Sequence, residues 1–394
     1  MKYDVLIIGA GIAGLAQALA LTRLGFRVAV VDHGVAPITW HQTDPWDSRV
    51  VALTRASQRL FEQFNVWSAI VERRCQPFEQ MQLWWPGQLE QAVYLSAEEA
   101  AEADLGIIVE QSVVRDALWS SLKEYVDCYW EQTWQALIVS TPVSALTLSS
   151  GLVLQADLII AADGAASPVR QYLAMGDVSW SYQARAVVAT LRSEQPHQAI
   201  ARQVFHPEGT LALLPLSDPH VCSLVWSVPP EKADTLLKFS KDAFCRSLSM
   251  AIDQSLGQLT LVTQPLSFPL QALCSQQFVL TGVAFIADAA HVLHPLAGQG
   301  LNLGLADVAC LTEVLTTARK QQRPIGHLAV LTPYGRKRKV AAEQMILLMS
   351  ALEKSGRFSA KYPQVGTRLM NLSLKRSRLL KTLTTTFALH ALNQ

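Results

Sequence analysis

Three glycines and one carboxylate near the start of the chain have the types and spacing of a phosphate-binding motif. Gly9, Gly11 and Gly14 form the sequence GxGxxG, and Asp32 follows about twenty residues later. In such a motif the first glycine permits a tight turn, the second lets the backbone approach a pyrophosphate, and the third lets a helix pack on a strand. A carboxylate placed like Asp32 accepts hydrogen bonds from a ribose hydroxyl. The motif therefore predicts a bound dinucleotide and leaves FAD and NAD as alternatives.

A second stretch, residues 287–305, combines an acid, a proline and three glycines. The acid is Asp288, the proline is Pro295, and the glycines are Gly298, Gly300 and Gly304. The glycines leave backbone N–H groups free at the start of a helix predicted to run to about Arg319, and such an end stabilises negative charge. A carboxylate beside it that binds polyol hydroxyls suits FAD, because NAD has no ribityl chain. This second stretch favours FAD.

The elements that must position these residues follow from hydrophobic patterning. Residues 3–8 form an apolar run of buried-strand length, residues 15–22 have helical spacing, Gly25 ends that helix, and residues 27–31 form a second strand. Further strand-like runs cover 152–161 and 278–286, whereas 184–228 and 259–270 indicate a separate set of β-strands. The predicted fold class is α/β, with a Rossmann-like FAD-binding domain, an inserted β-rich substrate domain and C-terminal helices.

The same pattern predicts domain boundaries. A discontinuous FAD-binding domain comprises residues 1–80, 107–178 and 276–345. The substrate domain comprises residues 81–106 and 179–275, and residues 346–394 form a basic C-terminal helical region.

Composition excludes some classes of function. The chain of 394 residues has 33 basic and 32 acidic residues, so no global charge directs it to nucleic acid. Its six cysteines are scattered without a CxxC pair, which argues against a zinc or iron–sulfur site. Asp288, His291 and His294 have a D-x2-H-x2-H spacing, but the flavin interpretation explains this stretch better than a metal. We expect no metal site and reduced cysteines in a cytoplasmic protein.

Residues 5–21 are apolar enough to imitate a signal peptide or a membrane span. The glycine motif explains them better, and no other segment is expected to have the length of a bilayer span.

Residues 287–305 resemble the GDAAH-x3-P-x2-GQG-x-N-x-G segment of the single-component FAD-dependent aromatic hydroxylases, the group that includes p-hydroxybenzoate hydroxylase. Within that group the chain is similar to the ubiquinone-biosynthesis hydroxylases over nearly its whole length. Residues 187–228 most resemble the bacterial 2-polyprenylphenol hydroxylases, which oxidise ring carbon 5. The sequence departs from the family at Ala287, where glycine is usual, at Ala166, where a larger polar or basic residue is usual, and at Asp32, where glutamate is commoner.

The resemblance implies a role for each matching residue. Gly9, Gly11 and Gly14 are expected to bind the FAD pyrophosphate, Asp32 the adenosine ribose, and Arg49 the diphosphate side. Gln111 and Arg115 are expected at the ribityl and ring edge, Asp163 at both FAD and NAD(P)H, and Asp288 at the ribityl chain. Pro295, Gly298, Gln299 and Gly300 are expected to flank the isoalloxazine, and Leu301 and Asn302 are further cofactor-binding residues. No side chain is assigned as catalytic, because the flavin carries the chemistry.

The resemblance further implies a monooxygenase that uses FAD, NAD(P)H and O2 to hydroxylate a polyprenylphenol in ubiquinone biosynthesis. Its expected partners are that substrate and other ubiquinone-biosynthesis proteins, with peripheral contact at the inner face of the cytoplasmic membrane. The alternatives are a prenyl reductase or halogenase on the same scaffold, or a non-catalytic flavoprotein-like assembly subunit, for which Ala287 is the one hint.

The basic C-terminal segment and four tryptophans each allow more than one interpretation. From Lys354 to Gln394 the chain has eight basic residues and no acidic one, and its leucines share one helical face. That pattern suits an anionic membrane surface, a partner subunit or packing on the protein itself. Trp84, Trp85, Trp180 and Trp226 are candidates for the wall of a prenyl-binding cavity, although packing in the core is the more frequent role of a tryptophan.

Overall fold

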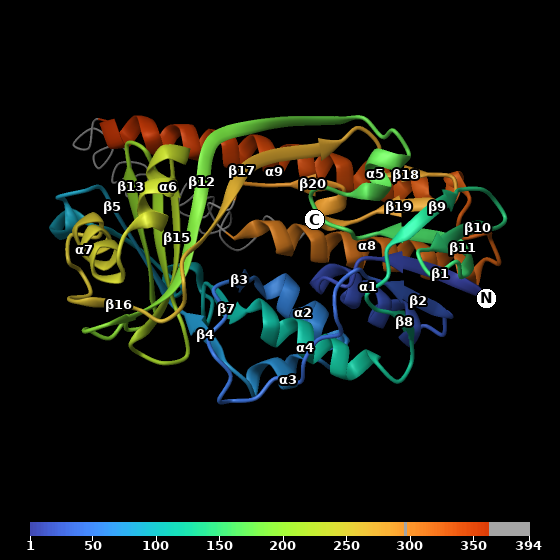
Figure 1. The fold of residues 1–394 in the computed structure, drawn as a ribbon, viewed down its shortest axis with the longest axis horizontal. Coiled ribbons are helices and arrows are strands. Elements are labelled where there is room, and N and C mark those ends of the chain that lie inside the picture. The colour runs from blue at the N-terminus through green and yellow to red at the C-terminus, as the bar shows by residue number, and fades with distance from the viewer. Residues whose placement is uncertain (295–297, 362–394) are drawn as a thin grey trace.

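The computed structural model describes residues 1–294 and 298–361, and it is built around two large sheets and two long helices (Figure 1). The strands of the first sheet are β1 (Lys2–Ile8), β2 (Val28–Val31), β8 (Asp127–Tyr129), β9 (Trp134–Ile138), β10 (Ser144–Leu148), β11 (Val153–Ala161), β18 (Val279–Leu280) and β19 (Val283–Phe285). Their order is β18-β19-β11-β1-β2-β8, with β10 paired to β11 and β9 to β10. The central run β19-β11-β1-β2-β8 is parallel, so the carboxyl ends of these strands meet at one edge.

Helices cover the nucleotide-binding sheet. They are α1 (Ile12–Arg23), α4 (Gln111–Leu122), α5 (Pro168–Tyr172), α8 (Gln299–Lys320) and α9 (Leu328–Lys361). Every residue from Ile12 to Leu21 is buried, because α1 packs on β1, α4 and α8. The apolar run 5–21 is therefore the first strand and helix of the core. The predicted domain boundary after residue 345 falls inside α9.

Helix α8 corrects one expectation from the sequence. Among the described residues it alone has the length and apolar composition of a membrane span, with a mean hydropathy of 1.2. Just over half of that window, 56%, is buried, and α8 packs on α1, α2 and α9. A core helix has the same composition as a marginal membrane span, so this feature is weak support for insertion.

The second sheet forms the β-rich part of the molecule. Its strands are β5 (Gln80–Trp84), β6 (Val93–Ser96), β12 (Asp177–Ser193), β13 (Ile200–His206), β14 (Gly209–Pro215), β15 (Val221–Val228), β16 (Leu259–Leu261), β17 (Leu266–Ser275) and β20 (His291–Val292). Their order is β20-β17-β12-β15-β14-β13-β5-β6, with β16 beside β12. The long strands β12 and β17 extend from this sheet toward the nucleotide-binding part, as Figure 1 shows.

Two helices, α6 (Pro230–Lys238) and α7 (Lys241–Ala251), pack on the second sheet and close a separate core. Trp84 and Trp226 lie inside that core, and Trp85 is buried beside Phe205. Core packing is thus confirmed for these three tryptophans. Trp180 differs, because 40% of its side chain is exposed.

A third, small sheet joins the two parts. It consists of β3 (Val50–Leu53), β7 (Gly106–Glu110) and β4 (Cys75–Phe78), in that order. Helices α2 (Arg55–Gln63) and α3 (Trp67–Val71) follow β3, and short 3-10 turns lie at η1 (Leu89–Gln91), η2 (Glu98–Ala100) and η3 (Ala287–Ala289). The predicted fold class is confirmed. One detail of the arrangement is that β20, from the segment predicted to belong to the FAD-binding domain, pairs with β17 of the second sheet.

Candidate functional site

Four predicted binding residues meet where parallel strands of the first sheet end. Gly9 follows β1, Asp32 follows β2, and Asp163 and Asp288 lie two and three residues beyond β11 and β19. Because β19, β11, β1 and β2 are neighbours in that order, these residues share one edge of the sheet. Ligands of open α/β sheets bind at this carboxyl edge.

The glycine turn has one crowded and one open side. Gly9 has a φ of +108°, and a Cβ added at Gly14 would strike the carbonyl oxygen of Gly9. Nothing lies within 4 Å of a Cβ added at Gly11. Helix α1 begins after Gly11 with no side chain capping its first N–H groups. The turn thus leaves backbone N–H groups beside open space, which is what a diphosphate requires.

Asp32 holds the end of β2 against this turn. Its Oδ2 accepts the N–H of Ala10 at 2.5 Å, and its Oδ1 accepts the N–H of Gly34 at 2.7 Å. Each carboxylate oxygen has two lone pairs, so Asp32 retains acceptor capacity for a ribose hydroxyl. Asp32 therefore contacts the glycine turn and can still accept a hydrogen bond from a ribose hydroxyl.

Helix α4 brings a cation to the same turn. The Nε of Arg115 donates to the carbonyl of Ala10 at 3.0 Å, and its guanidinium lies 6.0 Å from the ring centroid of Trp130. Gln111 starts α4, and its N–H donates to the carbonyl of Arg49 at 3.0 Å, which makes Gln111 and the exposed Arg49 neighbours. Arg115 therefore lies beside the glycine turn, and its contact with the ribityl chain and ring edge stays a prediction.

Asp163 binds the start of a helix. Its Oδ2 accepts the N–H of Val169 at 3.0 Å, in the first turn of α5. Desolvation by burial raises the pKa of its carboxyl. Ala166, one of the departures from the family pattern, is exposed on the turn between them.

Asp288 lies in the 3-10 turn η3 after β19, and it combines two properties that are seldom found together. Its side chain is exposed by accessible area, yet the protein around it desolvates the carboxyl and raises its pKa. The carboxylate is therefore open to solvent but has protein close around it, which suits the binding of a polyol hydroxyl.

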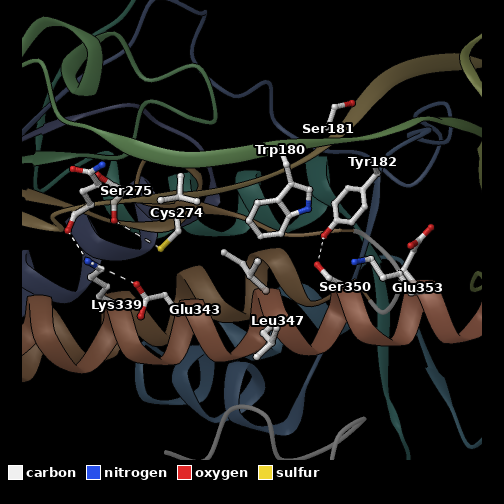
Figure 2. A pocket seen from close by; sticks show the side chains of 14 residues that line it. Trp180, Ser181, Tyr182, Cys274, Ser275, Lys339, Glu343, Leu347, Ser350 and Glu353 are labelled. Atoms are coloured by element: carbon white, nitrogen blue, oxygen red, sulfur yellow. Dashed lines mark hydrogen bonds and ion pairs between the residues drawn. The ribbon is translucent and has the colours of Figure 1, made fainter.

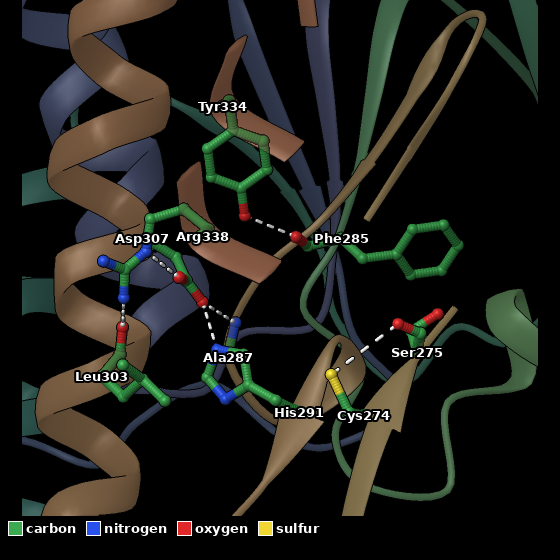
Figure 3. Close-up of polar contacts among 9 residues, drawn as sticks. All are labelled: Cys274, Ser275, Phe285, Ala287, His291, Leu303, Asp307, Tyr334 and Arg338. Carbon is green, nitrogen blue, oxygen red and sulfur yellow. Dashed lines mark hydrogen bonds and ion pairs between the residues drawn. The ribbon is translucent and has the colours of Figure 1, made fainter. Parts of the chain in front are cut away.

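A buried polar network holds that turn in place (Figure 3). The carboxylate of Asp307 on α8 accepts three hydrogen bonds. They come from Nε2 of His291 at 2.6 Å, Nε of Arg338 at 2.6 Å and the backbone N–H of Ala287 at 2.9 Å. Burial opposes ionisation of Asp307, but the charges and hydrogen bonds of His291 and Arg338 outweigh it and lower its pKa. Arg338 also donates to the carbonyl of Leu303 at 3.1 Å. The network fastens the Asp288 turn to both α8 and α9.

Sequence reasoning missed this network and assigned none of its bonds. A single acid inside the apolar run of residues 301–311 was the available signal, because a buried carboxylate needs partners. His291, weighed as a metal ligand, is instead bonded to Asp307. Among the described residues no group of three or more His, Cys, Asp or Glu side chains is arranged to hold a metal ion.

The N-terminus of α8 is held in place by hydrogen bonds of Asn302. Gly298 precedes it with a φ of +62°, and a Cβ at Gly300 would meet nothing within 4 Å. The Oδ1 of Asn302 accepts the hydroxyl of Ser57 at 2.7 Å, and its Nδ2 donates to the carbonyl of Ala52 at 2.7 Å. The side chain of Asn302 is therefore engaged with protein groups and fixes α8 against β3 and α2.

The remaining predicted residues of this stretch have different environments. Gln299 is 5% exposed and Leu301 is half-buried. Pro295 lies outside the described residues.

These features fit FAD. Helices α1 and α8 both begin without a side-chain cap, and each begins beside open space at a glycine. Asp32 adjoins the first and Asp288 precedes the second. A cofactor with a ribose, a diphosphate, a polyol chain and a ring that carries negative charge matches this order of groups.

Comparison with known proteins shows the family to which the chain belongs. Residues 2–348 match the family described as FAD binding domain. The chain is 33% identical to 3-demethoxyubiquinol 3-hydroxylase of Escherichia coli (strain K12), over 85% of each chain. It is 32% identical to the human mitochondrial ubiquinone biosynthesis monooxygenase COQ6, over 84% of this chain and 81% of that one.

The fold is also similar to p-nitrophenol 4-monooxygenase PnpA from Pseudomonas putida DLL-E4. The TM-score is 0.81 at 18% identity, covering 100% of this chain and 98% of that chain.

Proposed function

We propose that this chain hydroxylates the aromatic ring of a polyprenylphenol. It belongs to the FAD-dependent aromatic monooxygenases and, within them, to the family of the ubiquinone-biosynthesis hydroxylases. FAD is its cofactor and NAD(P)H is the co-substrate of the family. The observation that carries the proposal is the exposed Asp288 between strand β19 and the uncapped α8, in a chain similar to a demethoxyubiquinol hydroxylase over most of its length.

The proposed contacts with FAD follow the edge of the first sheet. The N–H groups from Gly11 into the first turn of α1 bind the diphosphate, because the N–H of Ala10 is held by Asp32. Asp32 binds the adenosine ribose, and Arg115 adds positive charge beside the turn. Gly14 contributes only close packing of α1. When bound, FAD supplies the electron transfer from NAD(P)H and the activation of O2.

The second half of the contacts lies at α8. Asp288 binds the ribityl hydroxyls, and the N–H groups from Gly298 to Gly300 stabilise negative charge at the pyrimidine end of the ring. Asn302 acts by positioning, because its side-chain amide is bonded to Ala52 and Ser57. Gln111, Arg49 and Asp163 stay as proposed contacts at the rim of the same edge.

The protein must also keep water from the reacting ring. An apolar cluster that includes Ala201, Leu216 and Val221 packs with Ala52 between the second sheet and β3. A Cβ added at Gly298 would lie 3.3 Å from the Cβ of Ala52, so this apolar cluster adjoins the start of α8. A low-dielectric wall strengthens the effect of the helix dipole on developing charge and prevents wasteful loss of activated oxygen.

The ring position is the finer part of the proposal. The resemblance of residues 187–228 favours ring carbon 5, whereas the Escherichia coli relative is named for position 3. Mass spectrometry of the quinone intermediate that accumulates in a strain lacking this gene distinguishes them. An intermediate that lacks only the carbon-5 hydroxyl supports our assignment, and one with that hydroxyl already present contradicts it.

The reaction class needs its own test. We expect the purified protein to be yellow, its flavin spectrum to be bleached by NAD(P)H, and a polyprenylphenol to stimulate NAD(P)H oxidation. One oxygen atom from labelled O2 should appear in the product. A product with a saturated prenyl double bond and no added oxygen would indicate a reductase, a halogenated product would indicate a halogenase, and a colourless protein would indicate a subunit without catalysis.

The location of the substrate suggests how the protein is placed in the cell. A polyprenylphenol resides in a membrane, so we propose peripheral contact with the inner face of the cytoplasmic membrane and with other ubiquinone-biosynthesis proteins. The basic segment predicted to make this contact runs from Lys354 to Gln394, and its residues 362–394 lie outside the described residues.

A further inference from the structure

A long groove lies between strands β12 and β17 on one side and helix α9 on the other (Figure 2). Its volume is about 700 Å³, within the range of small-molecule sites. The lining residues on α9 run from Lys339 to Lys354, a span of about 22 Å at the rise of an α-helix. The groove is therefore elongated and suits an extended chain.

The middle of the groove is apolar and exposed. Val178 and Trp180 of β12 face Ile346 and Leu347 of α9 across it, and Figure 2 shows the Trp180 ring extending from the strand toward Leu347. Trp180 is 40% exposed and Leu347 is 72% exposed. Large apolar side chains that face one another across an open groove indicate a ligand or a partner.

The charged side chains that line the groove lie toward its two ends (Figure 2). At one end Lys339 donates to the carbonyl of Gln276 at 2.8 Å and lies 3.7 Å from Glu343. At the other end Tyr182 and Ser350 share a hydrogen bond of 2.8 Å. A ligand along the middle thus meets hydrocarbon on both walls and no charged group.

The Tyr182 end adjoins the cofactor segment. The ring of Tyr182 makes an edge-on contact with the ring of His294 at 4.6 Å between centroids. His294 directly precedes residue 295, where the stretch predicted to flank the flavin ring begins. Cys274, another lining residue, pairs with His291 between β17 and β20. The groove and the Asp288 segment therefore share a wall.

We propose that this groove binds the polyprenyl chain of the substrate, with the chain lying along α9 and the phenol end directed past Tyr182 toward the cofactor segment. The inference rests on the proposed function for the identity of the substrate. A neutral hydrocarbon chain needs apolar walls and no charge, which is what Trp180, Ile346 and Leu347 offer.

The competing occupant is the basic end of this chain, residues 362–394. The charged residues that line the groove are Lys339, Glu343, Glu353 and Lys354, so its two acids are balanced by two bases. A basic segment would be favoured by an acidic surface, and the groove does not provide one. Charge therefore favours the neutral chain.

Photolabelling tests the location directly. A farnesyl-substituted phenol with a diazirine on its last isoprene unit is bound to the full-length holoprotein without NAD(P)H and irradiated. We expect labels on peptides from β12 around Trp180 and from α9 around Leu347, and competition by farnesylphenol but not by the phenol without its chain. Labels confined to other surfaces, or to residues 362–394, would overturn the proposal.

A matched pair of variants tests the affinity. Leu347→Asp places a carboxylate in the groove, whereas Val340→Asp places it on the same helix at a residue that is 52% exposed and does not line the groove. By calorimetry, Leu347→Asp should weaken binding of farnesylphenol at least tenfold and leave binding of the unprenylated phenol unchanged. Val340→Asp should change neither. Equal effects of the two variants, or none of Leu347→Asp, would refute the groove.

These measurements separate the two proposals because they require no turnover. Binding and labelling in the groove without hydroxylated product would refute the proposed reaction and retain the groove. Hydroxylation of farnesylphenol with an unchanged KM in Leu347→Asp would refute the groove and retain the reaction.

Discussion

The carboxylate of Asp307 lies 2.6 Å from Nε2 of His291, and neither side chain is exposed to solvent. Arg338 completes the group at 2.6 Å, with 3% of its side chain exposed. One carboxylate on α8 thus holds the turn that bears Asp288 and also holds α9, the helix that forms one wall of the groove. The cofactor segment and the groove depend on the same buried ion pair.

Replacing this carboxylate should destabilise the whole fold. Asp307→Asn leaves the buried Arg338 without its counter-ion, and breaking a buried pair costs about 3–5 kcal/mol. Urea unfolding of the FAD-free protein measures the loss. The control is Asp157→Asn, which removes an exposed ion pair with Lys2 and should cost about 0–1 kcal/mol. A similar loss for both variants would contradict the structural role of Asp307.

The same pair predicts a pH dependence. The pKa of Asp307 in the folded protein is below its ordinary value of 3.8, so the unfolded chain binds more protons in this range. The contribution of Asp307 to stability is complete above pH 3.8 and is lost as the pH falls through the lowered folded value. The difference in unfolding free energy between wild type and Asp307→Asn should therefore shrink as the pH falls below 3.8. A difference that grows with acid would contradict this sign.

Local patterns predicted most of the nucleotide-binding part. The turn from Gly9 to Gly14 and the position of Asp32 depend on neighbours close in sequence, and the structure has them as predicted. The hydrogen bond between Asp307 and Arg338 joins helices α8 and α9. Tertiary packing decides which helices meet, and the local hydrophobic periodicity of the sequence does not reveal it. The acid in an apolar helix indicated that some partner exists but not which one.

Two glycines of the first turn should respond in opposite ways. Gly11→Ala adds a methyl group to open space, so unfolding of the FAD-free protein should change by about 1 kcal/mol or less, while FAD affinity falls about tenfold or more. Gly14→Ala forces the methyl group against the Gly9 carbonyl and should cost about 1–3 kcal/mol or more of stability. Calorimetric FAD titration with urea unfolding checks both. Intact FAD affinity in Gly11→Ala would show that the diphosphate binds elsewhere.

Ala287 is a strained alternative to the glycine that is usual in the family. Its φ is +52°, a conformation that costs an alanine about 1–2 kcal/mol. Part of this is offset because glycine loses more entropy on folding, so Ala287→Gly should stabilise the protein by about 0.5–1 kcal/mol. Ala289→Gly, in the same turn but without positive φ, should destabilise it by about 1 kcal/mol. Urea unfolding that gives the same sign for both would contradict strain at Ala287.

The groove shows where sequence reasoning ends. Trp84, Trp180 and Trp226 all lie in strands, and their type alone favours the core for each. Only the packing of α9 leaves Trp180 facing an open groove while the other two are enclosed by the second core. Apolar residues at 178, 180 and 182 on one face of β12 were the local signal, but their partner on α9 lies more than 150 residues away.

The basic C-terminal segment should contribute to membrane contact without contributing to FAD binding. The sequence after Gly366 spaces several leucines so that a helix would place them on one face with basic residues around it, a pattern that binds anionic surfaces. Removing these residues should weaken sedimentation with anionic liposomes and leave the flavin absorbance of the purified protein unchanged. Raising the salt concentration should weaken binding of the full-length protein in the same way, because the attraction is screened. Unchanged binding of the shortened protein both to liposomes and to other ubiquinone-biosynthesis proteins would refute this role.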